Sequence, residues 1–190
     1  MGYGRDDDIP AVIERLRPLA VTYKEGLLGR HTIIEFNGMA LDIHWQKHHF
    51  MHLCGLECTV PQRFYRRKNK PVRSEVFFDA LLSGKTKGLN IRHSHNRGIT
   101  NDKLSVLPMM LLMPESVKYI AESASSDYRY FLGTSQWCIG VTLADEPPLD
   151  PDADVYAPRT VRNVSITSRS IQQVGTVLHP LTGSRTITPK

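Results

Sequence analysis

Histidines are the residues whose type and spacing most clearly suggest chemistry in this 190-residue chain. Five of the eight lie between residues 31 and 52, and two more, His93 and His95, flank a single serine. Because imidazole titrates near neutral pH, such side chains can take or give a proton at physiological pH. The same ring nitrogens also bind metal ions, so two kinds of site have to be weighed.

A zinc site is the first alternative. His48 and His52 are four residues apart, which on a helix lets two imidazoles meet one ion, and Cys54 and Cys58 lie nearby. However, the two cysteines do not form a CxxC pair, and Leu53 belongs to the apolar face of the same helix. We therefore favour a buried, hydrophobic role for Cys54, and we predict no bound metal and no cofactor.

Positive charge is concentrated close to these histidines. The chain carries 24 Lys and Arg against 19 Asp and Glu, a formal net charge of +5. Residues 61–103 hold 11 of the basic residues and three acids, so this stretch is +8 and the remainder is −3. A local excess of positive charge indicates a surface that faces a polyanion, with a solvated loop as the alternative.

Histidines beside arginines and lysines can cleave RNA without a metal ion. RNA supplies its own nucleophile, the 2′-hydroxyl. The protein then needs a base for the proton of that hydroxyl, an acid for the leaving 5′-oxygen and cations for the charged phosphorane. Arginine suits the last role because it grips two phosphate oxygens at once.

The basic stretch contains two groups of candidate residues. One is an arm next to Tyr65 that resembles a phosphate-contacting segment. The other is the polar connection 88–100, and loops carry function disproportionately. The predicted substrate-binding residues are Arg66, Arg67, Lys68 and Arg92. The residues predicted to be catalytic on chemical grounds are His93, His95 and Arg97 of this connection, together with Ser135, which lies outside the basic stretch in the turn 133–136.

Other enzyme classes have no support in the sequence. There is no Walker loop, Rossmann glycine fingerprint, HExxH, EF-hand or GxSxG pattern. Three cysteines argue against a disulfide framework and for a reducing compartment. No signal peptide is visible, and no apolar run is long enough to span a bilayer. We therefore expect a cytoplasmic protein that does not enter a membrane.

Helices and one hairpin are predicted for the first half of the chain. Apolar residues recur at helical spacing over 10–28, and residues 48–55 form a shorter helix that ends at a glycine. Between them, the runs 32–36 and 39–43 flank Asn37-Gly38, the strongest short-range hairpin signal. A third, amphipathic helix is predicted over 74–82, with Ser74 as its N-cap.

Strands dominate the second half. A helix over 103–112, capped by Thr100 or Asn101, is followed by a second hairpin built from 128–132 and 137–143. Residues 145–157 are acidic and proline-rich and read as a loop, and 160–167 alternates like a strand.

This order of elements predicts the α+β class with an antiparallel sheet. We expect a single domain over residues 1–168, with its core at about 32–145. Residues 169–190 are rich in Thr and Ser, and we expect a flexible C-terminal tail there.

Four motifs in a fixed order resemble a phage-associated nuclease family. Residues 50–56 read F-x-H-L-x-G-L, and residues 77–85 read FF-x-x-LL-x-G-K. A strand pair precedes the first motif, and a Lys-Leu helix at 103–107 follows the second, before a strand that ends at Ala144-Asp145. The chain thus resembles the PBECR group, named for its similarity to barnase, EndoU, colicin E5/D and RelE, and in particular its fourth subfamily.

The resemblance implies a small fold in which helices pack on an antiparallel sheet of about four strands. It also implies a metal-independent ribonuclease, often a toxin from a mobile element that an antitoxin or immunity protein neutralises. By the match of motifs it marks His52 and Lys103 as catalytic and Lys85 as a substrate contact. The product expected from attack by the 2′-hydroxyl is a 2′,3′-cyclic phosphate.

A function from a different class uses the same residues. The basic segment 61–103 could belong to a non-catalytic module that binds nucleic acid, and a protein whose histidines are merely packed is a third alternative. Phosphate contacts lose affinity steeply with salt, which separates the third from the first two. The sequence leaves the RNA target and the oligomeric state open.

Overall fold

The computed structural model describes residues 8–60, 70–123, 127–146, 149, 153–171 and 177–189. The predicted arm Arg66, Arg67 and Lys68 lies outside these described residues. Within the described part of the chain, no helix is both long and apolar enough to cross a membrane.

The first helix and the first hairpin match their predicted positions. Helix α1 spans Ile9–Gly26, and strands β1 (His31–Phe36) and β2 (Met39–His44) form an antiparallel pair. Asn37 and Gly38 join them with φ values of 46° and 73°. Two consecutive residues with positive φ are what a tight hairpin turn requires, so the Asn-Gly signal fixed the register of this pair.

A small sheet missing from the sequence prediction follows. Helix α2 spans Lys47–Cys54, and the chain leaves it directly into β3 (Leu56–Val60). Strand β3 pairs with β4 (Lys70–Pro71) on one side and with β5 (Asn90–His93) on the other. Strand β5 therefore lies inside the segment predicted as a polar connection, because four residues of mixed polarity give too short a pattern to detect.

Helix α3 spans Ser74–Leu82, as predicted, although Arg73 rather than Ser74 occupies the N-cap position. Helix α4 (Arg97–Met110) begins six residues earlier than predicted. Asn96 caps it, since the Asn96 side-chain oxygen accepts a hydrogen bond of 2.9 Å from the N–H of Ile99. Lys103 consequently lies in the second turn of α4, not at its start.

The large sheet is the main departure from the expected architecture. Strands β6 (Tyr119–Glu122), β7 (Tyr130–Gly133), β8 (Cys138–Leu143) and β9 (Asp154–Arg162) form an antiparallel series. Strand β9 then runs parallel to β2, which joins the N-terminal hairpin to this series. The α+β class is confirmed, but this sheet has eight strands among the described residues, so the expectation of about four was wrong.

Two strands from the predicted tail complete the large sheet. Strand β10 (Leu178–Pro180) pairs with β6 at one edge, and β11 (Gly183–Ile187) pairs with β1 at the other. The intervening residues bridge the two edges, because Leu181 N–H donates to the Lys118 carbonyl and Thr182 N–H donates to the Glu35 carbonyl. The curled sheet is thus closed by residues that we expected to be a flexible tail.

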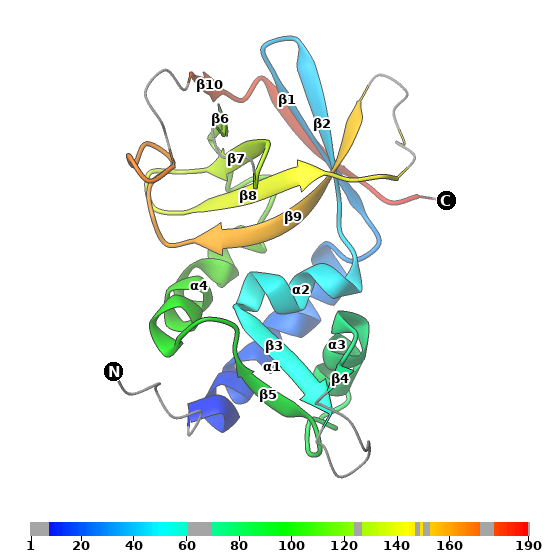
Figure 1. The fold of residues 1–190 in the computed structure, drawn as a ribbon. Helices are drawn as coiled ribbons and strands as arrows, with labels where there is room; N and C mark the ends of the chain where they lie inside the picture. Colours follow the sequence, from blue (N-terminus) through cyan, green and yellow to red (C-terminus); the bar gives the residue numbers. More distant parts are fainter. Residues whose placement is uncertain are drawn as a thin grey trace.

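Helices separate the two sheets. In Figure 1, α2 and α4 lie below β8 and β9, and the small sheet lies on the far side of α2. One hydrophobic cluster joins the layers, with members such as Leu16, Phe50, Phe78, Leu107 and Ile139 from four helices and a strand of the large sheet. The contact of α2 and α4 with β9 is the place where the predicted site residues meet the large sheet.

Truncation after Ile171 tests the structural role of the C-terminal strands. Removing β10 and β11 leaves the edges of β6 and β1 unpaired, so we expect a loss of about 2 kcal/mol and a melting temperature lower by about 4–8 °C. Thermal unfolding followed by circular dichroism measures the effect. Truncation after Ile187 is the control and should leave the melting temperature unchanged. Equal melting temperatures for both truncations would show that the segment is a dispensable tail.

Candidate active site

The F-x-H-L-x-G-L motif is the C-terminal half of α2 and its turn into β3. Phe50 and Leu53 are fully buried, whereas His52 between them is exposed. Gly55 ends the helix in the left-handed conformation, with a φ of 70°. This glycine reverses the chain direction without the steric cost that a Cβ atom would bring, so the motif presents one histidine at a sharply defined helix end.

Lys103 of α4 passes over this helix end. A Cβ atom on Gly55 would lie 2.9 Å from Cδ of Lys103, so the absence of a side chain makes room for the lysine stem. The Lys103 ammonium donates a hydrogen bond of 2.9 Å to the carbonyl oxygen of His52. A cation at the C-terminus of α2 also complements the helix dipole. Lys103 and His52, the two residues marked by the motifs, are therefore in direct contact.

A hydrogen-bonded chain behind Gly55 fixes this junction. The Gly55 carbonyl accepts from Ser94 N–H and from the Thr100 hydroxyl, both at 3.0 Å. The Thr100 hydroxyl in turn lies 2.8 Å from Nδ1 of the buried His93, whose Nε2 lies 3.0 Å from Asp8. Both ring nitrogens of His93 are thus engaged inside the protein, which favours a positioning role over direct contact with a substrate.

Strand β9 contributes two arginines, one near His52 and one near Lys103. Opposite β8, Gly140 pairs with Thr160 and Val141 pairs with Pro158, so Arg159 is the extra residue of a β-bulge. Bulges often re-aim a side chain beside an active site. Arg159 lies close enough to α2 to affect the titration of His52, and Arg162, at the end of the strand, does the same to Lys103.

A cavity of about 340 Å³ opens between α4 and the end of β9. Lys103, Asp102 and His95 line it from the α4 side, and Arg162 and Tyr128 line it from the other. The Cζ atom of Arg162 lies 5.4 Å from the Tyr128 ring centroid, which holds the guanidinium by a cation–π contact. The cavity thus places basic and aromatic groups next to the His52–Lys103 contact.

The environment lowers the pKa of both central residues. Partial desolvation of this otherwise exposed ring, and then the charges of Arg159, His48 and Lys103, lower the pKa of His52 below 6.5. Burial is also the main cause that lowers the pKa of Lys103, and Arg162 adds to it. His52 is therefore a neutral imidazole at pH 7, ready to accept a proton, while its exposure leaves it accessible to substrate.

His49, three residues before His52 on α2, has a structural role. Its Nδ1 accepts a hydrogen bond of 3.1 Å from Gln46 N–H and completes a capping box at the start of the helix. Burial is the main cause that lowers its pKa to about 3, and the charges of His48 and Arg159 contribute. A buried imidazole with such a pKa stays neutral at any physiological pH.

Other predicted residues lie away from the cavity. Arg97 pairs with Asp8 at 2.9 Å, and Arg92 pairs with Glu57 across β3 and β5. The remaining two are Lys85, exposed just after α3, and Ser135, exposed in the turn between β7 and β8. Of the predicted residues that the structure describes, His52, His95 and Lys103 are the ones brought to the cavity or its edge.

The cysteines near His52 are poorly suited to bind a metal. Cys54 and Cys58 are both buried, and burial raises the pKa of the Cys58 thiol to about 11 and that of Cys54 further. A metal ligand has to be the thiolate, which such burial disfavours. Among the described residues, no group of three or more His, Cys, Asp or Glu is arranged to hold a metal ion.

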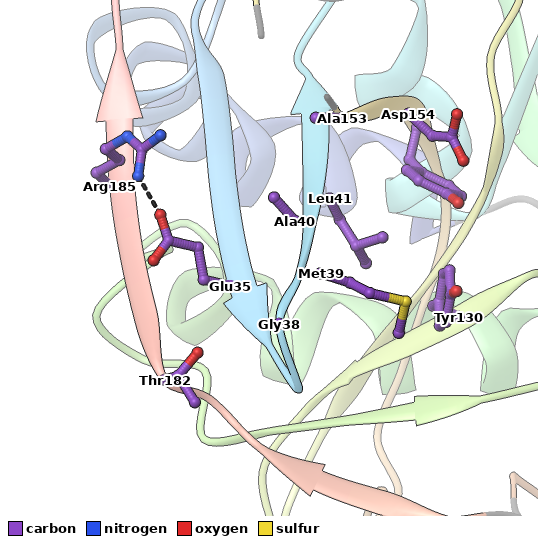
Figure 2. Close-up of a pocket in the computed structure, with 11 residues that line it drawn as sticks. Glu35, Gly38, Met39, Ala40, Leu41, Tyr130, Ala153, Asp154, Thr182 and Arg185 are labelled. Atoms are coloured by element: carbon purple, nitrogen blue, oxygen red, sulfur yellow. Dashed lines mark hydrogen bonds and ion pairs between the residues drawn. The ribbon is translucent and has the colours of Figure 1, made fainter. Parts of the chain in front are cut away.

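A second, larger cavity of about 560 Å³ lies beside the tip of the β1–β2 hairpin. Figure 2 shows the ion pair of Glu35 with Arg185 on one side of it and Met39 and Tyr130 on the other. Asp154 adds a further carboxylate to its lining. None of the predicted site residues lines this cavity, and its carboxylates make it a poor site for a polyanion.

The cavity between α4 and the end of β9 thus combines histidine, lysine and arginine side chains, which can transfer protons and stabilise negative charge. Residues 15–173 match the sequence model of a family described as phage-Barnase-EndoU-ColicinE5/D-RelE like nuclease 4. The chain belongs to this PBECR nuclease family, which confirms the resemblance of its motifs. Comparison with curated proteins and with solved structures finds no match for this chain.

Arg159 and Arg162 are the site residues that sequence reasoning missed. They lie outside the basic stretch 61–103, directly after an acidic segment, and only the pairing of β9 with β8 brings them to α2 and α4. The one available signal was the pattern Arg-Thr-Val-Arg at 159–162, in which two cations follow a predominantly acidic loop. No sequence pattern marks Tyr128, whose ring contacts the Arg162 guanidinium, as a site residue.

Substitution of Gly55 tests the Lys103 contact. Gly55→Ala places a side chain at a positive φ, which costs about 1–2 kcal/mol, and it also displaces Lys103. We expect lower stability together with a loss of nuclease activity. Gly29→Ala is the matched control, because Gly29 has a φ of 72° and open space around its Cβ position. Urea unfolding and an activity assay on both variants measure the two effects, and equal activity in both would contradict a role for the contact.

Proposed function

We propose that the protein is a metal-independent ribonuclease that uses the 2′-hydroxyl of RNA as its nucleophile. The observation that carries the proposal is the hydrogen bond from the Lys103 ammonium to the His52 backbone carbonyl, which keeps this cation beside an exposed histidine whose imidazole pKa is lowered, with Arg159 and Arg162 nearby. Membership of a nuclease family supports action on nucleic acid. The cations supply the positive charge that phosphoryl chemistry requires.

The proposed reaction has two proton transfers and one displacement. His52 takes the proton of the 2′-hydroxyl, the 2′-oxygen attacks the adjacent phosphorus, and the bond from phosphorus to the 5′-oxygen breaks. Arg159, Arg162 and Lys103 stabilise the extra charge on the phosphorane. His95, which lines the same cavity, is the proposed donor of the proton that the 5′-oxygen takes as it leaves. The products are a 2′,3′-cyclic phosphate and a free 5′-hydroxyl.

The other predicted residues take supporting roles in this proposal. His93 holds the helix junction through Thr100 rather than touching RNA. We propose further that the enzyme acts in the cytoplasm as a toxin, and that an antitoxin or immunity protein holds it in check. A map of cleaved tRNA, rRNA and mRNA after induced expression tests this part of the proposal, since a toxin should arrest growth and cut a defined RNA.

Replacement of His52 is the direct test of catalysis. Purified protein should cleave RNA in the presence of EDTA, and His52→Ala should lower the rate by about 100-fold or more, because a general base contributes about that factor. His179→Ala, in strand β10, is the control and should keep its activity. Product analysis should find the cyclic phosphate.

Two outcomes would point elsewhere. RNA binding that falls steeply with salt, but without cleavage under any condition, would favour the alternative of a non-catalytic nucleic-acid-binding module. Cleavage that EDTA abolishes and added divalent metal restores would contradict the metal-independent mechanism.

The pH dependence of cleavage tests the role of His52 as base. The base works only in its neutral form, so kcat/KM should fall as the pH drops through the lowered pKa, with a midpoint below 6.5. Arg159→Met removes a charge that lowers this pKa, and the midpoint should move to higher pH. Arg15→Met, on the exposed face of α1, removes an equal charge elsewhere and should leave it in place. An unchanged midpoint in Arg159→Met would contradict the assignment.

A further inference from the structure

We propose that the cavity between α4 and the end of β9 binds an unpaired guanine base next to the cleaved phosphate, with Asp102 as the residue that selects it. This inference rests on the proposed ribonuclease function and names the nucleotide that it recognises. Three observations carry it: the cavity itself, the Tyr128 ring and Arg162 guanidinium that line it, and its single carboxylate.

The cavity has the size and the surfaces that a base needs. Its volume of about 340 Å³ falls at the lower end of the range for small-ligand sites. Arg162 lies over two rings, with Cζ 5.4 Å from the centroid of Tyr128 and 5.3 Å from that of Phe131. Aromatic rings and guanidinium planes held in this way are the surfaces on which proteins stack unpaired bases.

A carboxylate such as that of Asp102 is not expected in a cavity that binds only phosphate. It is the only carboxylate among the residues that line the cavity, and a negative charge there repels a phosphate. Nor does it serve to neutralise its surroundings, because within the described part of the chain Asp102 forms no ion pair with Lys103 or Arg162. Its backbone carbonyl accepts from Ser105, but its exposed side chain is left available to a ligand.

The chemistry of a carboxylate selects guanine. An ionised carboxylate only accepts hydrogen bonds, and its two oxygens can accept two parallel bonds at once. Among the four RNA bases, guanine alone presents two neighbouring N–H donors on its Watson–Crick edge, from N1 and from the N2 amino group. Adenine and cytosine present one amino group beside an acceptor nitrogen, and uracil presents one N–H between two carbonyls.

The same geometry requires an unpaired nucleotide. The Watson–Crick edge that Asp102 would read is occupied in a duplex, and a base inside a helix cannot stack on Arg162 and Tyr128. Sequence-specific RNA recognition generally targets single strands and loops for this reason. Asp102 and Lys103 both line this cavity, so a base at Asp102 would be next to the phosphate held by Lys103.

Cleavage of oligouridine with one central guanosine tests the inference. We expect the wild-type protein to cut at this position about 10-fold or more faster than in the same strand with inosine, which lacks the N2 amino group, because one hydrogen bond to a charged acceptor is lost. Asp102→Asn should remove the difference while still cutting. Glu115→Gln, an equal change of charge at an exposed residue outside the cavity, should keep it.

Binding measurements separate this inference from the proposed function. A strand with 2′-deoxyguanosine at the central position cannot be cleaved there, and its affinity can be measured by fluorescence anisotropy against the deoxyinosine strand. A preference for guanine that Asp102→Asn abolishes supports the base site even if no RNA is ever cut. Cleavage without any guanine preference, or a preference that Asp102→Asn leaves intact, overturns the base site and leaves the ribonuclease standing. If neither binding nor cleavage prefers guanine, the inference is wrong.

Discussion

The arrangement of α2, α4 and the candidate site depends on one contact, in which the Lys103 side chain packs across the C-terminal end of α2. The lysine stem needs the space that Gly55 leaves, and its ammonium donates to the His52 carbonyl, so a residue of α4 is fixed against two residues at the end of α2. Around that point, Thr100 and Ser94 bind the Gly55 carbonyl and tie α4 and the small sheet to α2. The packing of α4 and β9 around this junction partly desolvates His52 and Lys103 and places cations near them, and both effects lower their pKa values.

Short sequence patterns predicted correctly those elements whose structure is determined by neighbouring residues. The Asn37-Gly38 turn, the glycine at the end of α2 and the amphipathic pattern of α3 each act within a few residues, and each was read correctly. The strands β3, β5, β6, β10 and β11 have three to five residues each, and their partners lie elsewhere in the chain. Such strands exist because of the sheet they join, so composition alone suggested a polar connection and a tail.

The candidate site residues also fall into two groups, those marked by a short motif and those placed only by tertiary pairing. His52 and Lys103 were predictable because each lies within a short motif, whereas Arg159 and Arg162 reach the site only through the bulge that β9 makes against β8. Charge counting even pointed away from them, since it singled out residues 61–103, while Arg92 and Arg97 from that stretch are paired with acids. Counting charges along the sequence therefore does not identify cations, such as Arg159 and Arg162, that only the pairing of distant strands brings close to His52 and Lys103.

The parallel pairing of β2 with β9 has a consequence for the order in which the protein is made. The hairpin of β1 and β2 emerges early from the ribosome, but its neighbours β9 and β11 lie at residues 154–187. Long-range pairings of this kind form late in folding, and until then the hairpin edges stay unpaired. Since Arg159 and Arg162 arrive with β9, the candidate site stays incomplete in the nascent chain until most of the residues have been translated.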